Sequence, residues 1–257
     1  MLVKACLNGG TSRASHAAVP LSAAELAADA IAVVKAGAGA IHIHPRDMSG
    51  ASAEGARDGS APESLDSAWV LPAVAALHKA VPGVPVGVTT GIWAVDGDPS
   101  ARLELVGNWF GPDRPDFASI NLSEPGAVEL YELLLDLDIP VEAGLWTVTD
   151  VDALVAAGFG PHSLRFLIEP NDQAGPDAVT TAAAISDALD TLGFTQPQIH
   201  HGYGDATWPV LAAAVARGHG IRVGLEDTAV LPSGARATGN ADLVAAAIGL
   251  ARGEAVV

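Results

Sequence analysis

The chain has 257 residues, 49% of them hydrophobic, and a formal net charge of −17 at pH 7. This hydrophobic content predicts a large buried core, and a length of about 250 residues suits one α/β barrel as well as two smaller domains. The negative charge disfavours nucleic acid and anionic membranes as partners. No apolar run reaches the ~18 residues of a membrane span and no signal peptide is recognisable, so we expect a cytoplasmic protein.

Short apolar segments alternate with segments of helical periodicity along the whole chain. The expected strands are Leu2–Leu7, Ala40–His44, Val84–Thr89, Phe117–Asn121, Pro140–Gly144, Ser163–Ile168, Gln198–Gly202 and Arg222–Leu225. The expected helices are Ala23–Lys35, Leu65–Ala80, Pro99–Asn108, Gly126–Leu135, Asp150–Ala157, Asp177–Leu192, Ala206–Arg217 and Ala241–Arg252. Eight strand–helix units with nearly continuous apolar strands predict a closed parallel (β/α)8 TIM barrel over residues 1–257, as a single domain.

A doubly wound open sheet is the alternative fold for alternating strands and helices. Such a sheet would need a glycine-rich fingerprint after its first strand to bind a dinucleotide. The segment Asn8-Gly9-Gly10-Thr11 is too short and lacks the third glycine. We therefore favour the barrel, in which an active site lies where the strands end and the following loops begin.

The second expected strand leads into the motif His42-Ile43-His44-Pro45-Arg46-Asp47. Because side chains alternate along a strand, the two histidines point the same way and the isoleucines point the other. A single buried histidine is more often a hydrogen-bonded core residue. Two parallel imidazoles at a strand end, with charged residues directly after them, instead predict a pair of metal ligands.

The glycine- and serine-rich span Met48–Pro62 follows the histidine pair directly. In a barrel this would be a loop on the catalytic face, long enough to act as a lid. A solvated excursion without a role is the alternative.

Polar residues also stand at the ends of the third to seventh strands. These are Thr89, Thr90, Ser119, Asn121, Glu142, Arg165, Glu169, His200 and His201. Burying the Glu142 carboxylate in an apolar strand costs several kcal/mol unless it is paired, so we expect an arginine (Arg165 or Arg222) or a substrate beside it. The two threonines either cap the following segment or contact substrate. Of the adjacent histidines only one can enter the barrel, and we favour His201.

The last strand supplies a partner for the histidine pair. Arg222, Gly224 and Glu226 share one face by the period of two, with Glu226 at the carboxyl end. Since the last strand of a closed barrel adjoins the first, Glu226 can reach a metal held by the two histidines. Two histidines and one carboxylate with an open position are typical of a catalytic zinc site. The alternative role for Glu226 is a helix N-terminal acid.

Four motifs together resemble the β-keto acid cleavage enzyme family, which includes 3-keto-5-aminohexanoate cleavage enzyme. They are His42-Ile43-His44-Pro45-Arg46-Asp47, Thr89-Thr90-Gly91, Ser119-Ile120-Asn121 and Arg222-Val223-Gly224-Leu225-Glu226-Asp227. The resemblance covers essentially the whole chain in order. It rests above all on the second-strand motif combined with the last-strand motif, because either alone would be a weak signal.

This resemblance implies a zinc-dependent acyl exchange, in which a β-keto acid and acetyl-CoA become acetoacetate and a new acyl-CoA. It implies that zinc is held by His42, His44 and Glu226. It implies catalytic roles for Asp227 and Arg222, which would remove a proton from C2 of the keto acid, and for Glu142, which matches the family's fifth-strand glutamate. It assigns substrate binding to Thr89, Thr90, Ser119 and Asn121. A homo-oligomer, a tetramer by the same resemblance, is also implied.

The first-strand loop departs from the family member that acts on an amino substrate. That enzyme has a glutamate there for the substrate's amino group, whereas this chain reads Asn8-Gly9-Gly10-Thr11-Ser12-Arg13. An unpaired buried ammonium costs several kcal/mol. We therefore expect a substrate without a 5-amino group, with a neutral or anionic side chain instead.

Three other functions remain open at this point. A zinc hydrolase of the amidohydrolase type also uses a His-x-His pair in a barrel, although on the first strand and with further histidines. A zinc class II aldolase needs a metal-stabilised enolate too. A barrel that has lost catalysis and serves as a binding protein would not need the intact ligand set.

Overall fold

The computed structural model describes residues 1–50, 61–171 and 174–254. Its strands are β1 (Val3–Cys6), β2 (Ala40–Ile43), β3 (Val86–Thr89), β4 (Phe117–Asn121), β5 (Val141–Leu145), β6 (Arg165–Ile168), β7 (Gln198–His200) and β8 (Gly220–Val223). Its α-helices are α1 (Ala23–Ala36), α3 (Ser67–Ala80), α4 (Pro99–Val106), α5 (Ala127–Asp136), α6 (Val148–Ala157), α7 (Gly175–Thr191), α8 (Thr207–Ala216) and α9 (Asn240–Ala251). Short 3-10 helices are η1 (Ile92–Val95), η2 (Gly160–His162) and η3 (Gly204–Ala206).

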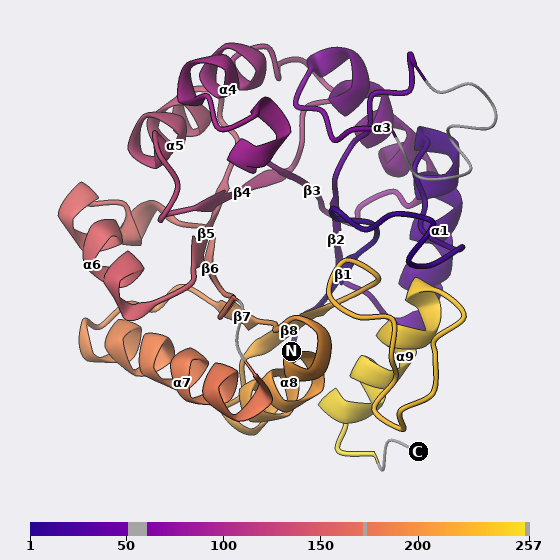
Figure 1. Ribbon diagram of the computed structural model, residues 1–257. Coiled ribbons are helices and arrows are strands. Elements are labelled where there is room, and N and C mark those ends of the chain that lie inside the picture. Colours follow the sequence, from indigo (N-terminus) through magenta and orange to yellow (C-terminus); the bar gives the residue numbers. More distant parts are fainter. Residues whose placement is uncertain (51–60, 172–173, 255–257) are drawn as a thin grey trace.

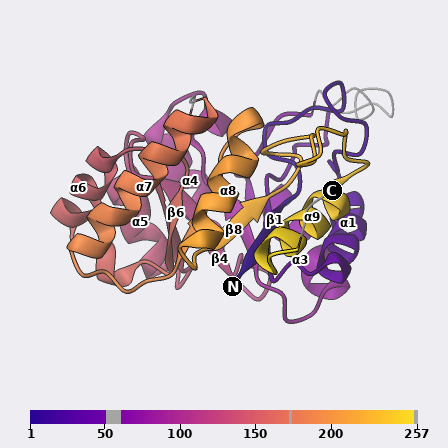
Figure 2. The same cartoon turned by 90° about the horizontal axis from the view of Figure 1, so that it is seen from below.

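The strands close into one parallel barrel in the order β1 to β8, and the helices surround it (Figure 1). β1 pairs in parallel with both β2 and β8, which closes the ring. The side view in Figure 2 places the N-terminus at the end of the barrel where β1 begins. The predicted TIM barrel is therefore confirmed, and the carboxyl ends of all strands meet at one mouth.

Local sequence signals account for the helix that follows β1. Ser22 accepts a hydrogen bond from the Glu25 backbone and Glu25 caps the Ser22 backbone in return, which is a capping box. Gly37 ends α1 with φ 117°, a left-handed conformation that glycine adopts without steric cost. Ile41 and Ile43 of β2 are fully buried in the core between strands and helices. His42 points the other way, into the barrel.

The eighth strand differs from its expected bounds. We expected Arg222–Leu225, but β8 ends at Val223 and the chain turns at Gly224, whose carbonyl accepts hydrogen bonds from the Asp227 and Thr228 backbones. A Cβ at Gly224 would overlap the carbonyl oxygen of Cys6, so the turn lies directly against β1. Glu226 therefore sits in a turn beyond the strand, and the period of two does not set its direction.

The expected lid, Met48–Pro62, lies largely outside the described residues, which lack 51–60. The two ends of this span are joined by an isolated antiparallel bridge between Arg46 and Glu63. Among the described helices, none combines the length and the apolar character needed to cross a membrane.

Candidate metal centre and active site

His42, His44 and Glu226 meet at the mouth of the barrel. His42 Nε2 lies 3.1 Å from His44 Nε2, and Glu226 approaches His44 Nε2 at 3.4 Å and His42 Nε2 at 3.9 Å. Within residues 1–50, 61–171 and 174–254 this is the one cluster of three such side chains placed to hold a metal ion. All three side chains are at most 7% exposed.

The turn after β8 brings Glu226 across β1 to His42 of β2 and to His44 just after it, as expected from strand adjacency. A Cβ at Gly9, which follows β1, would overlap the Glu226 side chain, so only glycine leaves room for this crossing. Asn240, the first residue of α9, holds the turn after β8 against the end of β1 through two hydrogen bonds. Its Oδ1 accepts from Leu225 N at 2.7 Å, and its Nδ2 donates to Leu7 O at 2.7 Å.

The chemistry of these three residues fits a divalent metal ion. The two Nε2 atoms lie 3.1 Å apart, and Glu226 Oε2 is buried without a hydrogen-bond partner among the described residues. Burial alone would raise the pKa of Glu226, but Arg222 and the histidines hold it well below its usual range. Burial lowers the pKa of His42, which favours the neutral imidazole that binds metals.

His44 is held from three sides. Its Nδ1 lies 2.6 Å from Glu63 Oε2, which also accepts a hydrogen bond of 2.9 Å from Trp93 Nε1. The Trp93 ring stacks on His44 with centroids 6.2 Å apart, and the Asn8 amide bonds both the His44 N and O at 2.9 and 2.8 Å. Although burial opposes it, the Glu226 and Glu63 carboxylates raise the pKa of His44 to about 9.

Glu63 is a functional residue that the sequence analysis missed. A carboxylate on the second nitrogen of a ligating histidine fixes its tautomer and raises its basicity. In the sequence Glu63 stands between the glycine- and serine-rich span and a helix, without a periodic pattern to mark it.

Arg222 links the carboxylates at the end of β8. It donates to Glu226 and, at 2.9 Å, to Asp227 Oδ1, while Asp227 Oδ2 is buried without a partner among the described residues. His201 approaches Asp227 Oδ1 with its Nδ1 at 3.3 Å and Glu169 Oε2 with its Nε2 at 2.7 Å. The structure thus brings His201 to the site, as we favoured. His200 instead packs against His219, with ring centroids 4.9 Å apart.

Three of the four predicted substrate-binding residues line the inner pocket beside the histidines, and one does not. Thr89, Ser119 and Asn121 line the inner pocket beside the histidines. Thr90 does not line it, since its hydroxyl donates to Ser119 O at 2.6 Å.

Glu142 is fully buried and does not line the pocket, although it stands opposite the lining residue Ser119 in the register of β4 and β5. It accepts hydrogen bonds from Lys4 and, at 2.5 Å, from Arg165 Nε, and the two cations outweigh the effect of burial and lower its pKa. The expected ion pair between Glu142 and an arginine is therefore present, with Arg165 as the arginine and Lys4 as a second cationic partner. A direct catalytic role for Glu142 stays a prediction that this position does not favour.

Two adjoining pockets open at the barrel mouth. The inner one, of about 160 Å³, contains the histidines and extends to Trp146, Glu169 and Asn171. The outer one, of about 600 Å³, is lined by Thr11, Ser12, Ser15, Thr228 and others. His44, Trp93, Tyr203 and Glu226 line both pockets, so they form the boundary between them.

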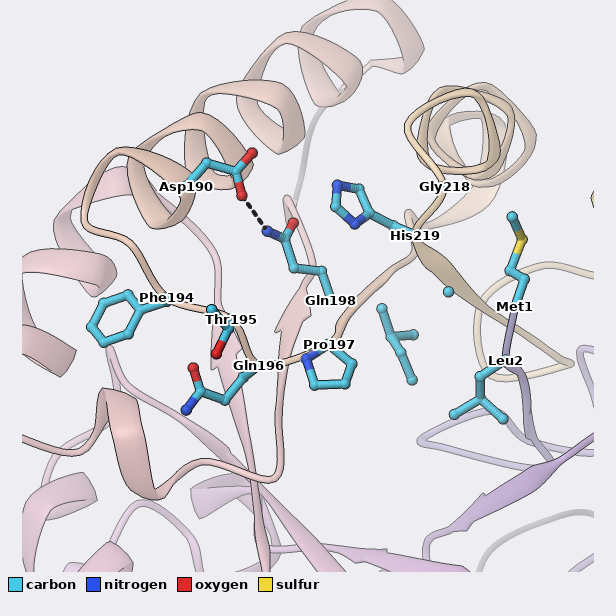
Figure 3. A pocket seen from close by; sticks show the side chains of 12 residues that line it. Met1, Leu2, Asp190, Phe194, Thr195, Gln196, Pro197, Gln198, Gly218 and His219 are labelled. Atoms are coloured by element: carbon cyan, nitrogen blue, oxygen red, sulfur yellow. Dashed lines mark hydrogen bonds between the residues drawn. The ribbon is translucent and has the colours of Figure 1, made fainter.

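A further cavity of about 390 Å³ lies at the opposite end of the barrel (Figure 3). It is lined by segments that precede β1, β7 and β8, with Gln198 donating to Asp190 at 3.3 Å. Because barrel enzymes place their chemistry at the carboxyl ends of the strands, the inner and outer pockets form the candidate active site.

Comparison with known proteins identifies the family of the chain. A family model described as beta-keto acid cleavage enzyme matches residues 1–254. The comparison of the sequence with curated proteins gives no match.

Solved structures show the same fold. The binary complex of ObcA with oxaloacetate has a TM-score of 0.71 at 18% identity, covering 93% of this chain and 65% of the ObcA chain. The ternary complex of ObcA with C4-CoA adduct and oxalate has a TM-score of 0.68 at 17% identity, with 93% and 65% covered. A 3-dehydroquinate dehydratase from Aquifex aeolicus has a TM-score of 0.54 at 13% identity over both full chains. This chain thus spans just under two thirds of the ObcA length.

The second-strand histidines, the carboxylate that reaches them from the end of the barrel and the match over residues 1–254 point to one conclusion. The chain belongs to the β-keto acid cleavage enzyme family, whose members cleave carbon–carbon bonds.

Proposed function

We propose that the protein is a zinc-dependent acyltransferase that converts a β-keto acid and acetyl-CoA into acetoacetate and a new acyl-CoA. The observation that carries this proposal is Asp227 Oδ2, a buried carboxylate oxygen without a partner among the described residues, directly beside the cluster suited to a metal. Family membership supports the reaction class. The ObcA structures with oxaloacetate and with a CoA adduct support keto acid and CoA ligands by analogy.

His42, His44 and Glu226 would hold the zinc ion, which when bound supplies the positive charge that stabilises an enolate as C2 loses its proton. Asp227 Oδ2 takes that proton. Arg222 holds Asp227 Oδ1 at 2.9 Å and leaves Oδ2 without a partner among the described residues, and Asp227 lines the outer pocket. The hydroxyls and amide of Thr89, Ser119 and Asn121 hold the substrate carboxylate by hydrogen bonds.

The remaining steps balance without another reactant. The C2 carbanion attacks the acetyl-CoA thioester, which enters from the outer pocket, and the CoA thiolate leaves. The thiolate then attacks the original ketone carbon, and the bond between that carbon and C2 breaks. Asp227 returns its proton to the carbanion so formed, releasing acetoacetate, and the new acyl-CoA departs.

The test is a screen of β-keto acids with acetyl-CoA, following acetoacetate release. We expect turnover that needs acetyl-CoA and stops when a chelator removes the metal. Products formed equally well without acetyl-CoA would contradict the proposal and favour the hydrolase or aldolase reading. The matched variant Asp227→Asn keeps the size of the side chain and should abolish turnover while the metal stays bound.

A homo-tetramer remains a prediction, which light scattering of the purified protein would test.

A further inference from the structure

The residues around the inner pocket fall into three groups by their position in the ring of strands. The cluster suited to a metal comes from β2 and the turn after β8. Hydroxyl and amide donors come from β3 and β4, as Thr89, Ser119 and Asn121. The residues that follow β5, β6 and β7 form the third group, with Trp146, Glu169 and Tyr203 lining the pocket. The strand order fixes this sequence of groups around the mouth.

A β-keto acid that binds as proposed would spread over all three groups. With its ketone oxygen toward the histidines and its carboxylate toward the donors of β3 and β4, the other substituent of the ketone carbon points to the third group. This substituent, the tail, is the part of the substrate that differs among β-keto acids. Trp146, Glu169 and Tyr203 therefore decide which tail is accepted.

Glu169 is a carboxylate that retains acceptor capacity. Its Oε1 accepts from Trp146 Nε1 at 2.5 Å and its Oε2 lies 2.7 Å from His201 Nε2, whereas a carboxylate can accept about four hydrogen bonds. The nearest cation among the described residues is Arg222, 3.9 Å away, and Arg222 already donates to Glu226 and Asp227. Glu169 thus lines the pocket bonded to Trp146 and His201, and among the described residues Arg222, 3.9 Å away, is its nearest lysine or arginine.

The charges around the pocket also favour a cationic substrate tail. Among the described residues, three carboxylates, Glu169, Glu226 and Asp227, lie within 3.9 Å of one guanidinium, that of Arg222. A divalent metal ion balances them, with the histidines taken as neutral. The keto acid then adds one negative charge. A second carboxylate in the tail would double this excess beside Glu169, whereas a cationic tail would cancel it.

We infer that the tail-binding group selects a β-keto acid whose tail carries a cationic nitrogen, bound by the Glu169 carboxylate with Trp146 and Tyr203 as aromatic walls. This deepens the proposed function and rests on it for the orientation of the substrate. It also revises the expectation from the first-strand loop. That loop has no carboxylate, but Glu169, which directly follows β6, lines the pocket instead.

The test uses the metal-loaded protein and three β-keto acids of equal chain length that end in an ammonium, a methyl or a carboxylate group. Calorimetry without acetyl-CoA measures binding alone. We expect the ammonium acid to bind at least about 10-fold more tightly than the methyl acid, and the carboxylate acid to bind most weakly. In Glu169→Gln the ratio between the ammonium and methyl acids should fall to about one.

Glu104→Gln is the matched control, because it makes the same chemical change at an exposed position of α4 away from the pockets, and it should leave this ratio unchanged. Equal binding of the three acids by the wild-type protein would overturn the inference, and so would a ratio that survives in Glu169→Gln. Binding of none of the acids would overturn it together with the proposed function. A clear preference for the ammonium acid, but no acetoacetate once acetyl-CoA is added, would support the tail site and contradict only the reaction.

Discussion

The contact between Glu63 and His44 offers the sharpest test of the metal centre. In Glu63→Gln the carboxylate that lies 2.6 Å from His44 Nδ1 becomes a neutral amide of nearly the same shape. The amide oxygen can still accept from both His44 and Trp93, as Oε2 does now, but an NH2 group replaces the other oxygen, which lies 3.9 Å from Arg46 Nη1. The hydrogen bond also loses its ionic character, which roughly halves its strength.

Loss of such a second partner of a ligating histidine lowers metal affinity by about 10- to 100-fold, which corresponds to about 1.4–2.7 kcal/mol. We expect Glu63→Gln to fall within this range. This loss of metal affinity should be smaller than the loss on removing a ligand, because the Asn8 amide still holds the His44 backbone at 2.8 and 2.9 Å.

Competition with a chromophoric chelator measures the zinc affinity directly. Glu104→Gln, the same chemical change at an exposed position of α4, is the control and should bind zinc as the wild type does. If Glu63→Gln binds zinc with wild-type affinity, Glu63 does not support the ligand, and the ion is not held through His44 Nε2 as described.

Three further outcomes follow from the structure. His44→Ala should lose metal and activity together while circular dichroism shows an intact barrel, because the site lies at the loop face; an unfolded variant would contradict this. Asp227→Asn should keep its zinc but abolish deuterium exchange at C2 of the keto acid, as seen by NMR, and exchange at the wild-type rate would place the base elsewhere. Burial raises the pKa of Asp29 to about 6, although a hydrogen bond from Asn240 opposes the shift. A carboxyl group whose pKa is higher in the folded than in the unfolded protein lowers the stability as pH rises from about 4 to 6, because the folded state then has to ionise a buried acid. Asp29→Asn removes this cost, so it should stabilise the protein by about 2–3 kcal/mol at pH 8 and little at pH 4. Urea unfolding at the two pH values measures the difference.

Several parts of the site were predictable because they depend on local sequence. The alternation of strand and helix patterns predicted the barrel, and the parallel directions of His42 and His44 were predicted from residues two apart in extended chain, at the end of β2. Adjacency of the first and last strands in a closed barrel then predicted that Glu226 would reach them. The role of Asp227 came from the family resemblance and stays a prediction.

Other features depend on contacts between distant segments. Glu226 reaches the histidines from a turn, because Gly224 bends the chain against Cys6 and Gly9 leaves space beneath the carboxylate. Glu63 and Glu169 are separated from their partners His44 and His201 by 19 and 32 residues. No pattern within either segment marks these pairs.

The sequence by itself determined the fold class and the parallel pair of histidines, since hydrophobic periodicity and side-chain alternation act over a few residues. Only the tertiary structure decided which carboxylates surround the ligands and the substrate tail. Closing the ring places the ends of eight strands at one mouth, and the distances between their side chains depend on strand register and turn geometry rather than on spacing along the chain.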